Sequence, residues 1–327
     1  MATAAAIETS YKNMFKEGFE QAFQQSNSRL RPYVEVESQA SEFDYYDRVG
    51  LADDMSEDTQ RYGDNPVNEI PHDRRRIGLR DFELGKPIDE KDLIRVVSDP
   101  TNAYTTAMVA SAHRKVDDLI ITGLTDIAYT GKAGGTSVLF ASDTANKITV
   151  GSISNEANNV TTAGKVVVEA GTEGIYISSD YTGGAAVETG LTIEKMKAVR
   201  ATMLRLEAIT QDTVINAFVT SSQISDLLGE DKLINLDYAA KARLEEGKVT
   251  EWGGFRFIHS ERLPKTGDVR SCFFTLPRAY KLSIGKDITA DIWRLSGQKN
   301  IPYIYIKLAM GGSRMWGEVL AVVDCNE

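Results

Sequence analysis

The sequence predicts an α+β fold in which two long helices separate groups of strands. Three observations lead to this prediction. A helix start at Ser98-Asp99-Pro100 opens about 23 residues of helical periodicity, because Asp99 suits the N-cap and Pro100 the first helical position. Short runs rich in β-branched and aromatic residues recur between residues 128 and 190. From residue 212 onward, apolar runs typical of strands alternate with a short helical pattern.

Composition excludes several classes of protein. The chain has 327 residues and a formal net charge of -10, and its pI is near 5.0. A general nucleic-acid binder usually presents a basic face, so this balance argues against that class. No apolar run approaches the roughly 20 residues of a transmembrane helix, and the N-terminus lacks the pattern of a secretory signal. We therefore expect no membrane attachment. We also expect Cys272 and Cys325 to be reduced, buried thiols.

The first hundred residues predict a helix followed by a long excursion. Residues 6–27 have apolar residues at helical spacing, and this helix either opens a domain or packs on another segment or subunit. From Tyr33, residues alternate as in a strand, then pass through a polar, acidic stretch at 50–70. The chain returns through an arginine run to Val97. We expect a strand leading out, an acidic tip and a strand leading back.

The remainder predicts an insertion, a second helix and a closing α/β region. The insertion is expected to be a small all-β unit built from hairpins, with strands at 137–141, 147–150, 165–169 and 174–178. The second helix spans 192–208. Further strands are expected at 214–220, 253–260 and 272–277, with a short helix after Ser221 or Ser222 as its cap. We expect the C-terminus to form a hairpin that turns at Gly311-Gly312.

Motifs of catalysis or metal binding are not found in the sequence. His72, His113 and His259 are scattered, without the spacing of a zinc site. Neither a Walker A pattern nor a GxSxG elbow occurs. Asp117 and Asp118 are adjacent on a helix and would point about 100° apart. The sequence therefore predicts no catalytic residue, cofactor or metal site, although an enzyme with a site built from scattered carboxylates stays open as an alternative.

An arginine run stands out in this acidic chain. Its interpretations are a phosphate-binding patch, a solvated charge run, or a surface that binds carboxylates of a neighbouring chain. The third is favoured because the guanidinium group binds carboxylate bidentately and an acidic stretch lies in the same excursion. The predicted subunit-contact residues are Arg74, Arg75, Arg76 and Arg80, with Asp53, Asp54, Glu57 and Asp58 as acidic candidates.

The order of elements and several phrases resemble the major capsid proteins of tailed bacteriophages, which have the Hong Kong 97-type fold. The phrases are RRRIGLRDFELGKPIDEKDLIRVVSDP, AHRKVDDLIITGL, GLTIEKMKAVRATM, VTSSQISDLLG and WGGFRFIHSERLP. The resemblance covers nearly the whole chain except residues 128–190, and the ordered set carries it more than any single motif.

The resemblance implies a place for each segment. Residues 1–32 would be an N-terminal arm, and 33–97 an extended two-stranded loop lying over the adjacent subunit. The remaining boundaries are a spine helix of the peripheral domain at 98–127, a β-rich insertion at 128–190, a second peripheral helix at 191–211, an axial domain at 212–285 and returning C-terminal strands at 286–327.

The resemblance also implies a function. The chain would assemble through hexamers and pentamers into an icosahedral head shell around double-stranded DNA, without sequence-specific binding. It would be made in the cytoplasm of a bacterial host and reside in the virion. A separate scaffolding protein, a portal and a decoration protein are expected partners. A nanocompartment shell of the same fold, which encloses cargo enzymes, is the alternative.

Overall fold

The structure is a computed structural model of the whole chain. It describes residues 25–50, 69–88, 101–141, 147–148, 172–181, 188–229, 251–295, 297 and 300–327, together with residues 52, 55, 57 and 67. The predicted N-terminal helix up to residue 24, the strand at 165–169 and the helix cap at Asp99-Pro100 lie outside these residues.

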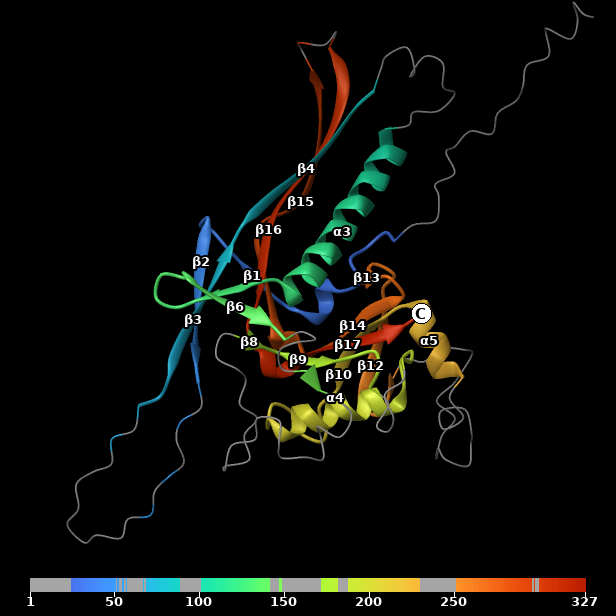
Figure 1. Cartoon of the computed structure of the whole chain (residues 1–327). Helices are drawn as coiled ribbons and strands as arrows, with labels where there is room; N and C mark the ends of the chain where they lie inside the picture. The colour runs from blue at the N-terminus through green and yellow to red at the C-terminus, as the bar shows by residue number, and fades with distance from the viewer. Residues whose placement is uncertain are drawn as a thin grey trace, which may run out of the picture. The chain divides into compact units, whose positions relative to one another are not determined.

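The chain divides into two compact units. The smaller unit contains residues 1–27, 81–114 and 286–308, and the larger one contains residues 28–80, 115–285 and 309–327. The boundary falls inside helix α3 (Thr101–Thr125) and strands β15 (Tyr280–Leu295) and β16 (Ile301–Arg314). Figure 1 shows α3 in green and the two strands in red.

The smaller unit contains long strands with aromatic side chains. Strand β4 (Arg80–Pro87) neighbours β16, and β16 neighbours β15. The ring of Trp293 lies 5.3 Å from that of Tyr303 and 5.1 Å from that of Tyr305, centroid to centroid. Gly85 is required opposite Tyr303, because a Cβ there would overlap the tyrosine side chain.

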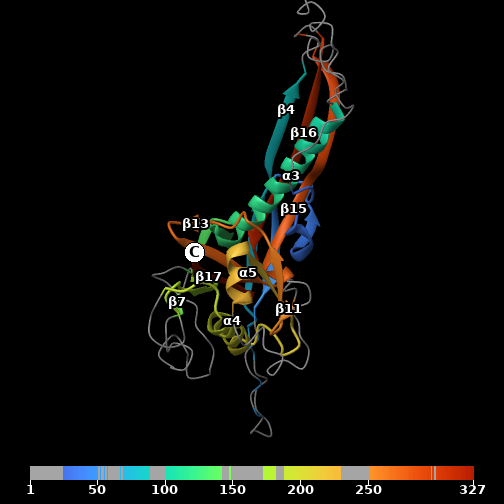
Figure 2. The ribbon, with the colours of Figure 1, turned by 90° about the vertical axis from the view of Figure 1, so that its right-hand side faces the viewer.

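The larger unit is built on an eight-stranded sheet with an apolar centre. Its order is β11 (Glu251–Trp252), β12 (Phe255–His259), β10 (Ile215–Val219), β14 (Val269–Thr275), β17 (Leu320–Asn326), β9 (Ile175–Ile177) and β7 (Lys147–Ile148), with β13 (Lys265–Thr266) paired to β14. All five residues of β10 are buried, as expected for a central strand. Helices α4 (Ile193–Arg205) and α5 (Ser221–Leu228) lie alongside this sheet (Figure 1 and Figure 2).

A five-stranded sheet in the same unit carries the arginine run. Its order is β2 (Phe43–Val49), β3 (His72–Gly78), β5 (Ala128–Thr130), β6 (Thr136–Phe140) and β8 (Thr172–Glu173). Strand β1 (Glu35–Ser38) pairs in parallel with the first part of β15. Single 3₁₀ turns occur at Arg31–Tyr33, Pro277–Ala279 and Gly317–Val319.

Several predicted elements are confirmed, with changes at their ends. Strands β2 and β3 form the expected antiparallel pair, which leads out to the acidic stretch and back. The cap of α5 is Thr220 and not Ser221 or Ser222, since the Thr220 N–H donates to the Gln223 side chain at 3.1 Å. Helix α3 ends at Thr125, and Gly123 within it makes room for the Tyr280 side chain. Both cysteines are free and buried, as predicted.

The prediction of a C-terminal hairpin is wrong. Strand β16 runs straight through Gly311-Gly312, and the following strand β17 belongs to a different sheet. The two glycines serve close packing and not a turn. A Cβ at Gly311 would overlap the carbonyl group of Gly78, and a Cβ at Gly312 would overlap the hydroxyl of Tyr280.

The predicted insertion is also different from expectation. Strands are present near 137–141, 147–150 and 174–178, and β6 forms a hairpin with β5, but the described strands do not form a separate unit. Strands β6 and β8 pair in parallel in the five-stranded sheet, and β7 and β9 pair in parallel in the eight-stranded sheet. Strand β9 pairs in turn with β17 near the end of the chain. The described strands of this region therefore complete both sheets of the larger unit.

Candidate subunit-contact site

The arginine run lies on β3, where alternation divides it between two faces. The pairing of β2 with β3 runs from Phe43 opposite Gly78 to Val49 opposite His72. Successive side chains of a strand point to opposite faces. Arg75 and Ile77 are buried on the inner face, whereas Arg74 and Arg76 lie on the outer face. The sequence run is therefore not one patch.

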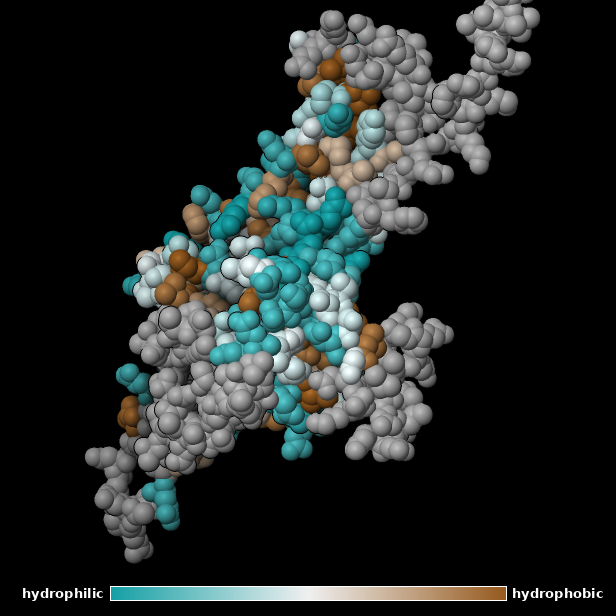
Figure 3. Space-filling view, turned by 45° about the vertical axis from the view of Figure 1, so that its right-hand side comes forward, coloured by the Kyte–Doolittle hydropathy of each residue, from teal (hydrophilic) through white to brown (hydrophobic). Residues whose placement is uncertain are grey.

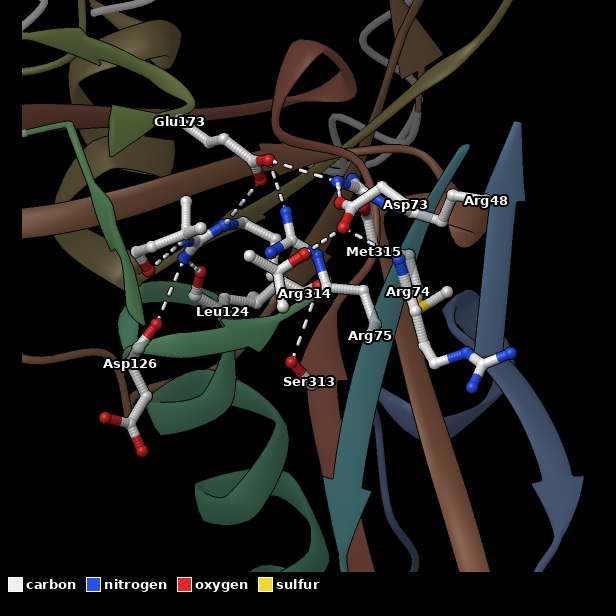
Figure 4. A network of polar contacts seen from close by, with 12 residues as sticks. Arg48, Asp73, Arg74, Arg75, Leu124, Asp126, Glu173, Ser313, Arg314 and Met315 are labelled. Atoms are coloured by element: carbon white, nitrogen blue, oxygen red, sulfur yellow. Dashed lines mark hydrogen bonds and ion pairs between the residues drawn. The ribbon is translucent and has the colours of Figure 1, made fainter. Parts of the chain in front are cut away.

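The inner face holds a buried arginine cluster, which we define as Arg48, Arg75 and Arg314 with Asp73 and Glu173. Figure 4 shows Arg75 and Arg314 pointing toward Glu173, while Arg74 points away from it. Arg75 and Arg314 are fully buried, and Arg75 Nη2 pairs with Glu173. Arg48 pairs with Asp73, and its Nη2 also lies 3.4 Å from Glu173 Oε1. Arg314 Nε lies 3.7 Å from Glu173 Oε2.

Hydrogen bonds to backbone carbonyls tie this cluster to other parts of the chain. Arg314 donates to the carbonyl oxygens of Leu124, Asp126 and Val138, each at 3.1 Å. These carbonyls belong to the end of α3, the segment after it and strand β6. Arg48 donates to the carbonyl oxygen of Met315. The base of the β2–β3 pair is thus fixed to the rest of the larger unit through guanidinium groups.

Burial dominates the electrostatics of the cluster. It lowers the pKa of Arg75, and it lowers the pKa of Arg314 to about 10. For Asp73, burial opposes ionisation, but hydrogen bonds from Thr130 and Arg48 prevail and lower its pKa to about 2. Among the described residues, Nε and Nη1 of Arg75 have no hydrogen-bond partner. Removing one member of such a cluster costs about 3–5 kcal/mol, because a buried charge is left uncompensated.

The outer face presents the other arginines differently. Arg74 Nε donates to Asp47 Oδ1 at 2.5 Å across the strand pair, and this hydrogen bond lowers the pKa of Asp47. The guanidinium carbon of Arg76 lies 5.2 Å from the ring centre of Phe43 and 4.8 Å from that of Tyr129. Both contacts fall within the range of cation–π attraction.

Arg80 and the acidic candidates occupy other positions. Arg80 is exposed and lies 3.8 Å from the Asp126 carboxylate, which is itself half exposed. Glu57 is exposed. Asp53, Asp54 and Asp58 lie outside the described residues. The structure therefore brings Arg74, Arg75 and Arg76 onto one strand, β3, and leaves Arg80 on the next one, β4.

The burial of Arg75 differs from the expectation of a surface contact. Its partner Glu173 lies 98 positions away in the sequence, in the region predicted as an insertion. Sequence reasoning also missed Arg48 and Arg314. One signal was present: in a strand, Arg75 must face opposite to Arg74 and Arg76, and the neighbouring inward position is the apolar Ile77.

The other polar candidates have ordinary structural roles. Asp117 is buried and accepts hydrogen bonds from the backbone N–H groups of Arg29 at 3.1 Å and Leu30 at 3.2 Å. Asp118 instead pairs with Arg262, at 2.5 Å. No group of three potential metal ligands occurs in the part of the chain that the structure describes. None of the described helices is both long and apolar enough to cross a membrane.

Comparison with protein families decides the identity of the chain. The profile of a family described as phage capsid protein matches residues 7–327. The chain belongs to the phage capsid protein family. It is therefore a major capsid protein. Copies of it associate to form the icosahedral head shell of the virion. No curated protein sequence matches the chain significantly.

Solved structures show the same fold at low sequence identity. The capsid of cyanophage Pam1 is 14% identical with a TM-score of 0.70, covering 100% of this chain and 99% of that one. The capsid of cyanophage P-SCSP1u is 13% identical with a TM-score of 0.68, covering 98% and 94%. The capsid of a native GTA particle is 13% identical with a TM-score of 0.64, covering 100% and 99%. The predicted Hong Kong 97-like fold is thereby confirmed.

Proposed function

We propose that this capsid protein assembles through hexamers and pentamers, and that the shell encloses double-stranded DNA without reading its sequence. The observation that carries this proposal is the construction of the β2–β3 pair. Its inner face is fixed by the buried arginine cluster, whereas its outer face exposes aromatic and arginine side chains. A rigid support with an exposed, partly apolar face is suited to repeated contacts between copies.

Arg76, Arg80 and the acidic stretch are the proposed electrostatic contacts. Arg75 is buried, and Arg74 binds Asp47 of its own chain at 2.5 Å. Arg76 is partly exposed, and the exposed Arg80 lies as far as 3.8 Å from its partner Asp126, so these two are the better candidates for a neighbour's carboxylates. Asp53, Asp54, Glu57 and Asp58 are the proposed counterparts. Each exposed pair contributes only about 0–1 kcal/mol, but a shell repeats it in every subunit. Weak repeated pairs allow misplaced subunits to dissociate before the shell closes.

The charge of the protein suits an enclosing role. A formal net charge of -10 disfavours tight binding to the DNA backbone, so packaged DNA would slide as it is condensed and released. A scaffolding protein, a portal and a decoration protein are proposed partners. We propose no catalytic activity, since the buried carboxylates described above are engaged by arginines or backbone N–H groups of the same chain.

Electron microscopy of the purified chain tests this function. The protein is expressed alone and then with candidate scaffolding and portal proteins. We expect closed polyhedral shells, or rings of five and six subunits, by negative staining. A uniform small oligomer under every condition would contradict the proposed assembly.

A further inference from the structure

We propose that the buried arginine cluster binds one small monovalent anion, of the size and charge of chloride, beside Arg75. Two observations carry this proposal. The cluster has an excess of one positive charge, and Arg75 has buried N–H groups that no described residue accepts. The cluster lies within one chain, so this anion site does not depend on the proposed assembly.

Full burial is unusual for a charged side chain. Charged residues ordinarily lie at the surface, and the face of the molecule in Figure 3 is mainly hydrophilic. The side chains of Arg75 and Arg314 are nonetheless 0% exposed, and that of Arg48 is 10% exposed. A charge this far from water needs both an opposite charge and hydrogen-bond partners within the protein.

The carboxylates of the cluster do not balance its guanidinium groups. Glu173 is shared by Arg48, Arg75 and Arg314, and Asp73 pairs with Arg48. Among the described residues of the cluster, three guanidinium groups and two carboxylates therefore leave one positive charge uncompensated. Burial is the main cause that lowers the pKa of Arg75; the Glu173 carboxylate opposes this change, and the Arg48 guanidinium adds to it. A bound anion of single charge would cancel the excess.

Arg75 also has N–H groups without an acceptor. Its Nη2 binds Glu173, but no acceptor among the described residues meets its Nε or Nη1. A small shift would bring Arg314 Nε, which lies 3.7 Å from Glu173 Oε2, within hydrogen-bond distance. That shift would leave both donors of Arg75 unpaired. A buried donor without a partner in the chain calls for a bound water molecule or ion.

An anion meets these requirements better than water alone. Nε and Nη1 lie on different edges of the planar guanidinium group, so an anion at one edge leaves the other edge to a water molecule. Water at both edges would satisfy the donors but would leave the excess charge in place. Because protein interiors are close-packed, an ion of chloride size is favoured over a larger one.

Aromatic rings strengthen the attraction by excluding water from the cluster. The guanidinium carbon of Arg314 lies 5.3 Å from the ring centre of Phe140. That of Arg48 lies 5.0 Å from the ring centre of Trp316. Each ring covers one flat side of a guanidinium group, and in such apolar surroundings opposite charges attract more strongly than they do in water.

A second buried cation of this chain is satisfied without an anion. Lys195 is fully buried, and its Nζ donates to four backbone carbonyl oxygens. They belong to Ser179 at 3.0 Å, Thr189 at 2.7 Å, Gly190 at 3.0 Å and Asp324 at 2.9 Å. The three protons of the ammonium group thus have enough acceptors. Lys195 is therefore a matched control site for Arg75.

Urea denaturation of the unassembled chain at increasing chloride concentration tests the site. Sodium gluconate replaces sodium chloride at constant ionic strength, because gluconate is too large for a close-packed interior. A ligand that binds only the folded chain stabilises it in proportion to the logarithm of its concentration near saturation. We expect the unfolding equilibrium constant to fall about tenfold for each tenfold rise in chloride, and bromide to act like chloride. No difference between chloride and gluconate would overturn the proposal, as would an equal effect of sulfate.

Charge changes within the cluster should shift the chloride effect in opposite directions. Arg75→Met removes the unpaired donors and the excess charge, so the unfolding constant should become independent of chloride. Glu173→Gln enlarges the excess, so chloride should act at a concentration at least ~10-fold lower. Lys195→Met also removes a buried cation, but the response to chloride should stay that of the unmodified protein. If all three variants respond to chloride as the unmodified protein does, the cluster is not the site.

Bromide locates the ion directly in the unmodified protein, whether or not the variants fold. In crystals grown in sodium bromide, we expect anomalous scattering to show one peak in contact with Arg75 in each copy of the chain. Peaks at the protein surface alone would overturn the proposal.

Discussion

The inner side of β3 and the centre of the eight-stranded sheet are both buried, but they are built in opposite ways. Phe218, Phe273 and Val323 fill the eight-stranded sheet with apolar groups. Behind β3, Arg75 and Arg314 surround the single carboxylate of Glu173. Apolar burial stabilises without direction, whereas buried ion pairs stabilise little and require one geometry. The first region maintains the fold, and the second sets how the β2–β3 pair is held.

The largest expected effect lies in the apolar region. Phe273→Ala should lower the free energy of unfolding by about 3–5 kcal/mol, because it removes a fully buried ring and leaves a cavity. Chemical denaturation of the unassembled chain measures the change. Phe273→Leu is the control and should cost much less. A cost for Phe273→Ala below that of Glu173→Gln would reverse the comparison.

The cluster behind β3 should respond next. Glu173→Gln removes the carboxylate that Arg75 and Arg314 share, and we expect a loss of about 3 kcal/mol in the free energy of unfolding. Glu194→Gln makes the same chemical change at an exposed pair with Lys197 and should cost less than about 0.5 kcal/mol. If both variants lose the same small amount of unfolding free energy, the buried arginine cluster does not stabilise the fold more than an exposed ion pair does.

Acid should weaken the cluster before it weakens the apolar region. The folded-state pKa of Asp73 is about 2, below its ordinary value of 3.8. Its stabilisation is therefore complete above about pH 4 and is lost as the pH falls toward 2. We expect a loss of about 1 kcal/mol, reduced from the full linkage value because Asp73 is more than one third exposed. The difference in unfolding free energy between the unmodified protein and Asp73→Asn should shrink over this range; a constant difference would contradict it.

A smaller effect is expected at a helix end beside the apolar sheet. Thr220→Ala removes the cap side chain of α5 and should cost about 1 kcal/mol. Thr220→Ser retains the hydroxyl and should cost less. Thermal unfolding of both variants measures the difference. If the two variants unfold at the same temperature, the Thr220 hydroxyl does not cap the helix.

The same contrast explains what could be predicted from the sequence. Strand β10 and helix α4 were predictable because apolar spacing and cap residues are local signals, seen at Ile215, Met196 and Thr192. The ion cluster was not, because Arg75 finds Glu173 at a separation of 98 residues and neither side chain shows its partner locally. The course of β16 was mispredicted for a similar reason. Gly311 reads as a turn until the carbonyl of Gly78 is seen against it.

The buried carboxylate of Asp117 has a mechanical consequence. It accepts the backbone N–H groups of Arg29 and Leu30 and a hydrogen bond from the Ser28 hydroxyl, and it belongs to helix α3. Leu30 is itself fully buried. Tension applied to the chain before Ser28 would therefore reach the hydrogen bonds of Asp117 first, at the side of helix α3 and not at the edge of a sheet. Strand pairing would bear this load only after the bonds to Asp117 had broken.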